Sequence, residues 1–371
     1  MVVTVTIRGT AIPPENVLAD VTIRSGRTRA DDGLAAASAT VEVVTPDPAG
    51  AAVSIADPLV ITVDGHARFT GRVSEVVRAP ASDPDDTSFT IVGIGQIARL
   101  PRVQIPLPLA ATNAHARVAS VLATAGIPAV IQGGDTYALA AYGVAGDDPV
   151  GADQIIGAVM SDTGCVVADL GDGSILCQFL DSRISDIQWT PDPSLTYVDL
   201  QWEQTDDLVN DVSVEWPGGA PAAASSPDSI ATYERHALTV QTGLGSLAAA
   251  QQRATNIIRR LAIPAWQIGA VESWDPAALD HGIGTLITIA PLGASSPVAG
   301  GSWQGVLEGW EDRYGPDATG QLSGTWTLAV SDRAHSSSTV TWGGVYPTTL
   351  QWGQVDPATS WQEAQSNSDL S

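Results

Sequence analysis

Short segments in which apolar and polar residues alternate dominate the first 97 residues of the chain. Alternation with a period of two is typical of a β-strand that buries one face. Clusters of proline, glycine and aspartate, which favour turns, separate the segments. Together they predict a first β-barrel domain over residues 1–97, with strands at residues 3–7, 20–24, 39–44, 59–63, 69–76 and 88–92.

An internal echo of this pattern occurs near the other end of the chain. An apolar strand, a strand with an aromatic residue two positions before a glycine, and a closing strand with an aromatic residue follow one another twice. The first copy covers residues 59–63, 69–75 and 87–91, and the second covers residues 286–289, 303–308 and 324–328. Coincidence among short β segments is the alternative explanation. A true repeat predicts a second, related β-barrel domain over residues 196–333, with a helical insertion at about residues 228–265.

Helical signals occur between these two β regions. Asn113 is placed to cap a helix whose apolar residues fall on one face before Gly126 ends it. A second helix is expected from about residue 151 to residue 161, and a third begins at Ser246 inside the second β region. We therefore expect a mainly β protein with an α+β insert domain over residues 98–195.

The two cysteines, Cys165 and Cys177, flank a predicted β-hairpin. A two-residue turn at Asp172 and Gly173 would place Cys177 opposite Ala168. Because Cys165 and Ala168 are an odd number of positions apart, the two thiols would then lie on opposite faces of the hairpin. We expect free, mostly buried thiols and assembly in a reducing compartment.

The charge balance is strongly acidic. The chain has 41 Asp and Glu against 17 Lys and Arg, a formal charge of −24, and every one of its cations is an arginine. Its densest cationic cluster is only Arg24, Arg27 and Arg29. DNA and anionic lipid are bound through cations that neutralise phosphates, so this composition argues against a protein that wraps nucleic acid or coats a membrane. The sequence also lacks an uninterrupted apolar run of about 18 residues, so we expect no membrane insertion.

The order of these elements resembles that of the tail hub (baseplate hub) proteins of tailed bacteriophages. The resemblance covers roughly residues 1–333. It is carried by residues 23–27, the strand at 69–73, the α+β insert, the strand at 210–214, the segment 228–235 and the helix that begins at Ser246. The family often has glycine after the tyrosine of segment 228–235, where this chain has Glu234. The resemblance depends on the order of the elements rather than on one diagnostic motif.

The resemblance implies a minor tail protein with a structural role. Proteins of this family form a trimeric, pseudo-six-fold ring that joins the tail tube to the tail tip and leaves a channel for DNA ejection. We therefore expect a homotrimer at the virion tail tip, assembled in the host cytoplasm, in contact with the tail tube or a distal tail protein ring and with tip, fibre or tape-measure proteins. Three chains would carry three times −24, or −72, and a channel wall of that sign would repel DNA in transit. The alternative is that the acidic surface only keeps the protein soluble.

The last segment, residues 334–371, is rich in tryptophan and differs from the rest of the chain. Two Trp-Gly units and a further tryptophan lie within it, and so short a segment cannot bury three tryptophans by itself. We expect an extended arm that docks onto a neighbouring subunit or the next tail protein. Its candidate partner-binding residues are Trp342, Tyr346, Trp352 and Trp361. The alternative is that the arm folds back onto its own second β domain.

Enzyme and metal-site signatures are missing from the sequence. The five histidines are scattered without a pair at helical spacing, and there is no nucleophile elbow or phosphate-binding loop. We expect no enzymatic activity, no metal and no cofactor. Because eleven tryptophans could line a sugar-binding surface, a receptor-binding or carbohydrate-binding tail tip protein is the alternative function. Five of them lie in apparent strands, where a core position is expected: Trp202, Trp216, Trp303, Trp310 and Trp326.

Overall fold

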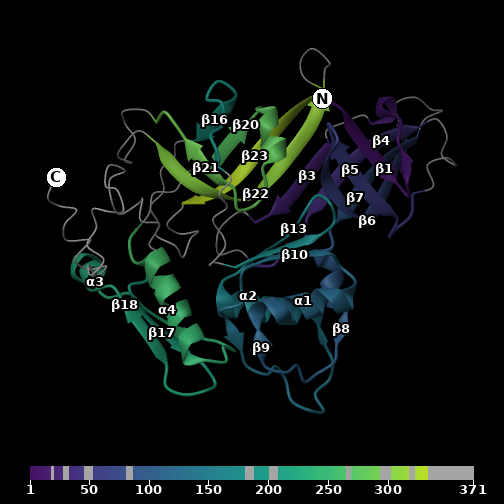
Figure 1. Ribbon diagram of the computed structural model, residues 1–371. Helices are drawn as coiled ribbons and strands as arrows, with labels where there is room; N and C mark the ends of the chain where they lie inside the picture. Colours follow the sequence, from purple (N-terminus) through teal and green to yellow (C-terminus); the bar gives the residue numbers. More distant parts are fainter. Residues whose placement is uncertain are drawn as a thin grey trace, which may run out of the picture.

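The computed structural model shows one broad layer of strands with helices on one side of it. In Figure 1 the strands of the large sheet lie across the top, and α1, α2 and α4 lie below them together with several short strands. The structure describes residues 1–17, 21–27, 33–45, 53–80, 87–179, 188–199, 208–264, 268, 270–292, 302–316 and 322–332.

The first β unit contains the six strands that the alternating pattern predicts. Hydrogen bonding orders them as β3-β4-β7-β6-β5-β1, with the short β2 beyond β1. The strands are β1 (Val3–Ile7), β2 (Thr10–Ala11), β3 (Val21–Gly26), β4 (Ser38–Thr45), β5 (Pro58–Val63), β6 (His66–Pro80) and β7 (Thr87–Ile94).

The second β unit repeats this order with a second set of six strands. Its hydrogen-bonded order is β16-β20-β23-β22-β21-β15. If the six strands of each unit are numbered in chain order, leaving out the short β2, the hydrogen-bonded order is 2-3-6-5-4-1 in both units. The one difference is that β15 runs parallel to β21, whereas β1 runs antiparallel to β5. The strands are β15 (Gln188–Trp189), β16 (Thr196–Asp199), β20 (Ala270–Ser273), β21 (Leu286–Ile289), β22 (Trp303–Pro316) and β23 (Leu322–Asp332).

The similarity between the two β units extends to details of the backbone. The Phe69 ring lies against Gly71, where an added Cβ would stand 2.6 Å from it, and the Trp303 ring lies against Gly305 in the same way. A register shift also follows at the same place in both copies, at Ser74 in β6 and at Glu308 in β22. Matching strand order, matching ring-on-glycine contacts and matching bulges favour a true repeat over coincidence.

The two units share one sheet. Strand β3 of the first unit pairs with β22 of the second, and the described strands form a continuous 13-stranded sheet. No closed barrel is present among the described residues. The prediction of two related β units is therefore confirmed in strand order, but the described strands do not form the two separate barrels that the sequence suggested.

The α+β insert follows its predicted helices closely. Helix α1 (Ala114–Ala125) begins after Asn113, whose side chain accepts a hydrogen bond from the N–H of Ala116, and it ends at Gly126 in the left-handed conformation. Helix α2 (Ala152–Thr163) ends in the same way at Gly164. The remaining short elements of this region are η2 (Ile97–Arg102), β8 (Gln104–Ile105), β9 (Thr112–Asn113), β10 (Ala129–Gln132), β11 (Ala138–Leu139) and β12 (Val150–Gly151).

The cysteine hairpin differs from the prediction by one residue. Strands β13 (Val166–Asp169) and β14 (Ile175–Gln178) pair Cys177 with Val167 rather than with Ala168. The connection has three residues instead of two, with Gly173 at φ +87°. A shift of one residue reverses the face of every side chain, so both thiols point to the same side, into the core of the insert. The prediction of opposite faces is wrong, whereas the prediction of free, buried thiols is confirmed.

The segment between β16 and β20 forms a small sheet of its own. Strand β17 pairs with β18 and β19, and helix α4 packs on β17 and β18. Its buried residues join the core of the α+β insert, so the strand predicted near residue 211 does not lie in the second β unit. The domain boundaries at residues 97, 195 and 333 stay predictions. The elements are β17 (Asp211–Glu215), β18 (Ala222–Ser225), α3 (Pro227–Tyr233), β19 (Ala237–Gln241) and α4 (Leu247–Leu261), and the other short helices are η1 (Pro14–Asn16) and η4 (Pro276–Asp280).

Candidate functional site

The residues that the sequence singled out as partner-binding fall outside the described part of the chain. These are Trp342, Tyr346, Trp352 and Trp361, and the whole of segment 334–371 lies there with them. The docking arm therefore stays a prediction. Among the described residues, the junction between the two β units stands out because it contains two buried ion pairs.

The junction is an antiparallel pairing of two strands that are far apart in the sequence. Residues Val21–Gly26 of β3 pair with residues 309–314 of β22. Gly26 and Gly309 stand opposite each other, and a Cβ at Gly309 would come within 2.6 Å of the Ser25 carbonyl oxygen. Glycine at both positions lets the two backbones approach closely at this end of the junction.

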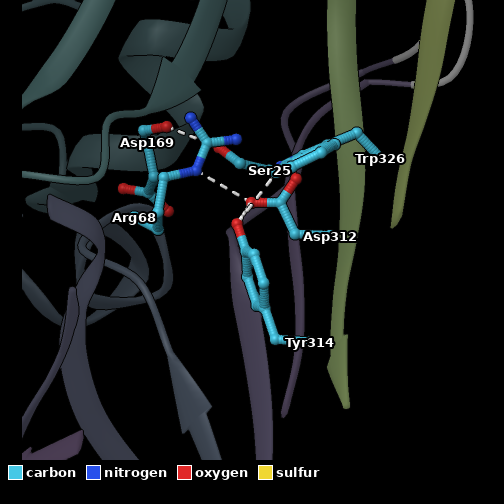
Figure 2. A network of polar contacts seen from close by, with 6 residues as sticks. All are labelled: Ser25, Arg68, Asp169, Asp312, Tyr314 and Trp326. Atoms are coloured by element: carbon cyan, nitrogen blue, oxygen red, sulfur yellow. Dashed lines mark hydrogen bonds and ion pairs between the residues drawn. The ribbon is translucent and has the colours of Figure 1, made fainter. Parts of the chain in front are cut away.

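A buried ion pair crosses the junction (Figure 2). Arg68 of β6 donates from Nε to Asp312 Oδ2 of β22 at 2.8 Å, and both side chains are almost completely buried, at 6% and 0% exposed. Tyr314 donates its hydroxyl proton to the same Asp312 oxygen at 2.8 Å, and Trp326 Nε1 donates to the Tyr314 hydroxyl at 3.3 Å. The guanidinium group of Arg68 also lies over the Trp310 ring, 4.7 Å from its centre. One carboxylate thus links strands of both units.

The titration behaviour of this cluster follows from its burial. Burial disfavours the charged form of Arg68, but the charge and the hydrogen bond of Asp312 outweigh that effect and raise the pKa of Arg68 above its ordinary value. Burial raises the pKa of Tyr314 strongly, and the neighbouring Asp312 carboxylate adds to the rise. Near neutral pH, Arg68 therefore stays charged and Tyr314 stays protonated.

A second buried ion pair lies at the β22 bulge. Arg27 Nε donates to Glu308 Oε2 at 2.9 Å, and Glu308 is fully buried. The Ser331 hydroxyl donates to the other Glu308 oxygen, and the Arg27 N–H donates to the Glu308 carbonyl oxygen at 3.1 Å. The bulge, which shifts the register of β22 against β23, thus coincides with the carboxylate that binds the first unit.

The hairpin of the α+β insert is attached to the same junction. Asp169 accepts hydrogen bonds from the N–H groups of Ala37 at 2.8 Å and Ile97 at 3.0 Å, and its carbonyl oxygen accepts one from the Ser25 hydroxyl at 2.7 Å. Burial raises the pKa of Asp169, and these backbone hydrogen bonds oppose the rise. A side chain at Gly95 would collide with the Asp169 carboxylate. The insert and both β units therefore meet around a few buried polar groups.

Sequence reasoning missed this junction. It treated Arg24 and Arg27 only as a weak cationic cluster, and it did not single out the acids of the second unit. A signal was present, because Glu308 and Asp312 alternate with Trp310 and Tyr314 and so fall on the face that those aromatic residues would bury. An acid at a core position of a strand is expected to find a buried cation, but the sequence does not say which one.

One buried amide connects two of the segments that contribute to the resemblance, the strand at 210–214 and the segment 228–235. Asn210 Nδ2 donates to the Ser229 hydroxyl at 3.2 Å and to the Glu234 carbonyl oxygen at 2.6 Å, and its Oδ1 accepts from the N–H of His236 at 2.7 Å. Glu234, which stands where the family often has glycine, has φ +66°, in the region that favours glycine. Glu234 therefore adopts a backbone conformation that favours glycine.

Most tryptophans of the described strands are in the core. Trp303, Trp310 and Trp326 are buried as expected, and Trp216 is half-buried. Trp202 lies outside the described residues. Trp274 is 43% exposed, the one strongly exposed tryptophan among the described residues. These positions account for the tryptophan content of the β units by packing rather than by a sugar-binding surface.

Three further findings bear on function. In the part of the chain that the structure covers, no group of three or more His, Cys, Asp or Glu side chains is placed to hold a metal ion. None of the helices in the described ranges combines the length and the apolar character needed to span a bilayer. A small pocket of about 200 Å³ lies between the β15–β16 loop and the end of β21, and its lining of Pro191, Pro193, Thr196 and residues 289–292 contains no acid, base or nucleophile suited to catalysis.

Neither the protein-family models nor the curated proteins contain a match to this chain. Solved structures do match it. The tail protein from Neisseria meningitidis MC58 superposes with a TM-score of 0.64 at 12% identity, covering 91% of this chain and 98% of that protein. The 43 kDa tail protein of prophage MuSo2 from Shewanella oneidensis gives 0.60 at 10% identity, covering 90% and 99%.

A third match comes from a bacterial secretion system. It is a component of the type VI secretion system of E. coli that is described as structurally similar to the T4 bacteriophage tail proteins gp27 and gp5. Its TM-score is 0.53 at 12% identity, and the alignment covers 90% of this chain and 78% of that protein. All three matches cover about nine-tenths of the chain. The chain therefore has the gp27-like fold of phage tail proteins.

Proposed function

We propose that this protein is a structural tail hub, a trimeric ring with pseudo-six-fold symmetry that joins a tail tube to a tail tip. The observation that carries the proposal is the repeated six-stranded unit. Each chain holds two units with the same strand order, joined side by side in one sheet. Three such chains would present six similar units around an axis, which matches a six-fold tube on one side and a three-fold tip on the other.

The buried junction supports this role. A ring of this kind works only if the two units of each chain keep a fixed relative orientation. The β3–β22 pairing connects the units, and the Arg68–Asp312 and Arg27–Glu308 pairs add two contacts that are withdrawn from water. A buried ion pair specifies one geometry because leaving either partner unpaired is costly.

The position and partners of the protein follow from the same proposal. The ring would lie at the tail tip of a virion assembled in the host cytoplasm, between the tail tube or a distal tail protein ring and tip, fibre or tape-measure proteins. DNA would pass through its channel without specific binding. The charge of −24 per chain suits a wall that repels the duplex in transit.

The tryptophan-rich segment 334–371 would extend this assembly. We retain Trp342, Tyr346, Trp352 and Trp361 as the residues that dock on a neighbouring subunit or on the next tail protein. Deletion of residues 336–371 should abolish recruitment of that partner while the ring still forms. Unchanged recruitment would refute the docking arm and leave the ring proposal intact.

The ring itself is tested by negative-stain imaging of the purified protein at rising concentration, together with native mass spectrometry. The expected result is a three-chain ring with an open centre wide enough for duplex DNA. Monomers at every concentration would contradict the proposal. Monomers that also bind host surface polysaccharide would instead support the receptor-binding alternative.

A further inference from the structure

The second β unit contains a small pocket that the proposed hub function does not use. It has a volume of about 200 Å³ and lies between the β15–β16 loop and the residues that follow β21. In Figure 1, β16 and β21 lie at the same end of the β layer. An apolar cavity of about 150 Å³ is large enough to bind benzene, so this pocket is large enough for one aromatic side chain. Apart from Thr196, its lining is apolar and includes three prolines: Pro191, Pro193, Ile289, Ala290, Pro291 and Leu292.

The surface beside the pocket is apolar as well. Leu195 is 39% exposed and Trp274 is 43% exposed, and they are the two exposed large apolar side chains among the described residues of the second β unit. Leu195 directly precedes the lining residue Thr196, and its carbonyl oxygen accepts a hydrogen bond from the Trp274 N–H at 2.7 Å. Apolar side chains that stay exposed beside a pocket enlarge the area that a bound segment can cover.

The loop that carries two of the prolines is held in place by hydrogen bonds. Within the loop, Asp192 Oδ1 accepts from the Ser194 N–H at 2.8 Å and from the Ser194 hydroxyl at 2.7 Å. The Asp192 N–H donates to Asp275 Oδ2 at 3.4 Å, which connects the loop to the start of η4. The pocket is therefore formed before anything binds to it, so binding does not have to order the loop.

The chain leaves the sheet close to this pocket. Asp332 of β23, the last residue that the structure describes, pairs with Gly305 of β22, and Gly305 pairs with Ile287 of β21. Neighbouring strands are about 4.8 Å apart, so the backbone at Asp332 is about 10 Å from β21. Both β21 and β23 run antiparallel to β22. The segment after Asp332 therefore leaves towards the same end of the sheet as residues 289–292, which line the pocket.

That segment carries an aromatic side chain within reach. Trp342 is the first tryptophan after Asp332 and follows it by ten residues. Ten extended residues span up to about 33 Å, which is about three times the separation of β23 and β21. Trp352 and Trp361 would close longer loops, which costs more chain entropy. Proline and aromatic side chains pack on each other when aromatic-lined grooves bind proline-rich segments, and here the pocket supplies the prolines and the arm supplies the ring.

We propose that the pocket between the β15–β16 loop and the end of β21 binds the indole ring of Trp342 of the same chain. This contact anchors the arm, so that Tyr346, Trp352 and Trp361 extend from a fixed point towards the neighbouring protein. The inference rests on the docking arm proposed above and changes one detail of it, since Trp342 then binds its own chain rather than the partner. It does not depend on the ring.

Limited proteolysis of the full-length protein with chymotrypsin tests the anchor. The bonds after Trp342 and after Trp352 both join tryptophan to glycine, so the arm contains the test site and a matched control. Each cleavage rate is divided by the rate at the same bond in a synthetic peptide of residues 336–371. Because a protease cuts only the released form of a bound segment, cleavage after Trp342 should then be at least about tenfold slower than cleavage after Trp352.

Pro193→Glu should remove this protection, because it places a carboxylate in the apolar lining. Pro193 is exposed, so the change leaves the core of the unit intact. Pro149→Glu is the matched control, because Pro149 is also an exposed proline but lies beside β12 in the insert. Equal cleavage after Trp342 and Trp352 in the unmodified protein, or protection that survives Pro193→Glu, would overturn the proposal.

Disulfide cross-linking shows which chain the arm binds. The full-length variant Pro193→Cys/Gly343→Cys should form a disulfide within one chain at least about tenfold faster than Pro193→Cys/Gly353→Cys, because the anchor raises the local concentration of the first pair only. The native cysteines do not interfere, because Cys165 and Cys177 are both buried. Equal rates for the two variants, or disulfides formed only between chains, would contradict an anchor within the chain.

The outcomes separate this inference from the proposed function. A contact within one chain does not depend on concentration, so protection of Trp342 should be the same in dilute samples that contain only monomers. Protection without recruitment of a partner by the arm would refute the docking arm and leave the anchor intact. Recruitment that is lost on deletion of residues 336–371, with no protection of Trp342, would keep the docking arm and overturn the anchor.

Discussion

Removal of the charge of Asp312 should destabilise the protein far more than removal of the charge next to it. The Asp312 carboxylate is fully buried, lies 2.8 Å from Arg68 Nε and accepts the Tyr314 hydroxyl proton. In Asp312→Asn, the guanidinium group would stay buried without a counter-charge, which costs about 3 kcal/mol or more of unfolding free energy. Glu311 is the matched control. It pairs only with the exposed side chains of Arg24 and Arg313, so Glu311→Gln should cost about 1 kcal/mol or less.

The double variant Arg68→Met/Asp312→Leu sharpens this prediction. Replacement of a buried ion pair by apolar residues of similar size is often nearly neutral, because the cost of desolvating both charges disappears. The loss of the Arg68 contact with the Trp310 ring should subtract about 1 kcal/mol. We therefore expect the double variant to be more stable than either single variant, with a coupling energy of about 3 kcal/mol or more between the two positions.

Urea unfolding followed by tryptophan fluorescence measures these differences. Trp310 and Trp326 lie in the cluster itself, so their emission reports the part of the molecule that is perturbed. The midpoint of the transition should fall strongly for Asp312→Asn, fall little for Glu311→Gln and recover in the double variant. Additive effects of the two single changes, or equal effects at Asp312 and Glu311, would refute the view that a desolvated ion pair holds the two units together.

Three further outcomes are expected. Burial raises the pKa of Cys165 to about 11, so neither Cys165 nor Cys177 should react with a thiol reagent at pH 8 until the protein is unfolded; rapid reaction in the folded state would contradict their burial. Gly305→Ala should destabilise the second β unit by about 1–3 kcal/mol in urea unfolding, because the new methyl group would overlap the indole ring two residues earlier. His281 stacks on Trp189, and burial lowers its pKa. The neutral imidazole therefore contributes to the stability of the folded protein above about pH 6.5, and this contribution is lost as the pH falls through the lowered pKa of His281. The unfolding free energy of His281→Gln should depend less on pH in that range.

Most of the local structure could be predicted because its causes are local. Asn113 and Gly126 mark the ends of α1, and the strands of the first unit follow from alternation alone. The hairpin shows the limit of such reasoning. The Asp172 side chain accepts hydrogen bonds from the Ser174 N–H and hydroxyl groups, and Leu170 pairs with Ser174 around a three-residue loop. An Asp-Gly pair is compatible with a loop of two or of three residues, and this difference reverses the faces of the strands.

The repeat was visible in the sequence, but its consequences were not. The repeated order of an apolar strand, a strand with an aromatic residue two positions before a glycine, and a closing aromatic strand predicted a related pair of β units. The structure adds that the aromatic ring packs on the glycine of its own strand in both copies. The sequence could not predict that the units share a sheet. Every unpaired strand edge presents the same backbone N–H and C=O groups, whatever its side chains. The alternating pattern alone therefore does not distinguish a closed barrel from two units that pair through β3 and β22.

What the sequence by itself determined is the strands of the first β unit, the ends of α1, the repeated pattern and the acidic character of the chain. What only the tertiary structure decided is which edges meet and which charges are removed from water. Arg68 and Asp312 are 244 positions apart, and Arg27 and Glu308 are 281 positions apart. Their attraction becomes strong only after the fold has excluded water around them, because the same charges on an exposed surface would contribute almost nothing. The physical reason is that local preferences act within a few residues, whereas desolvation is a property of the assembled core.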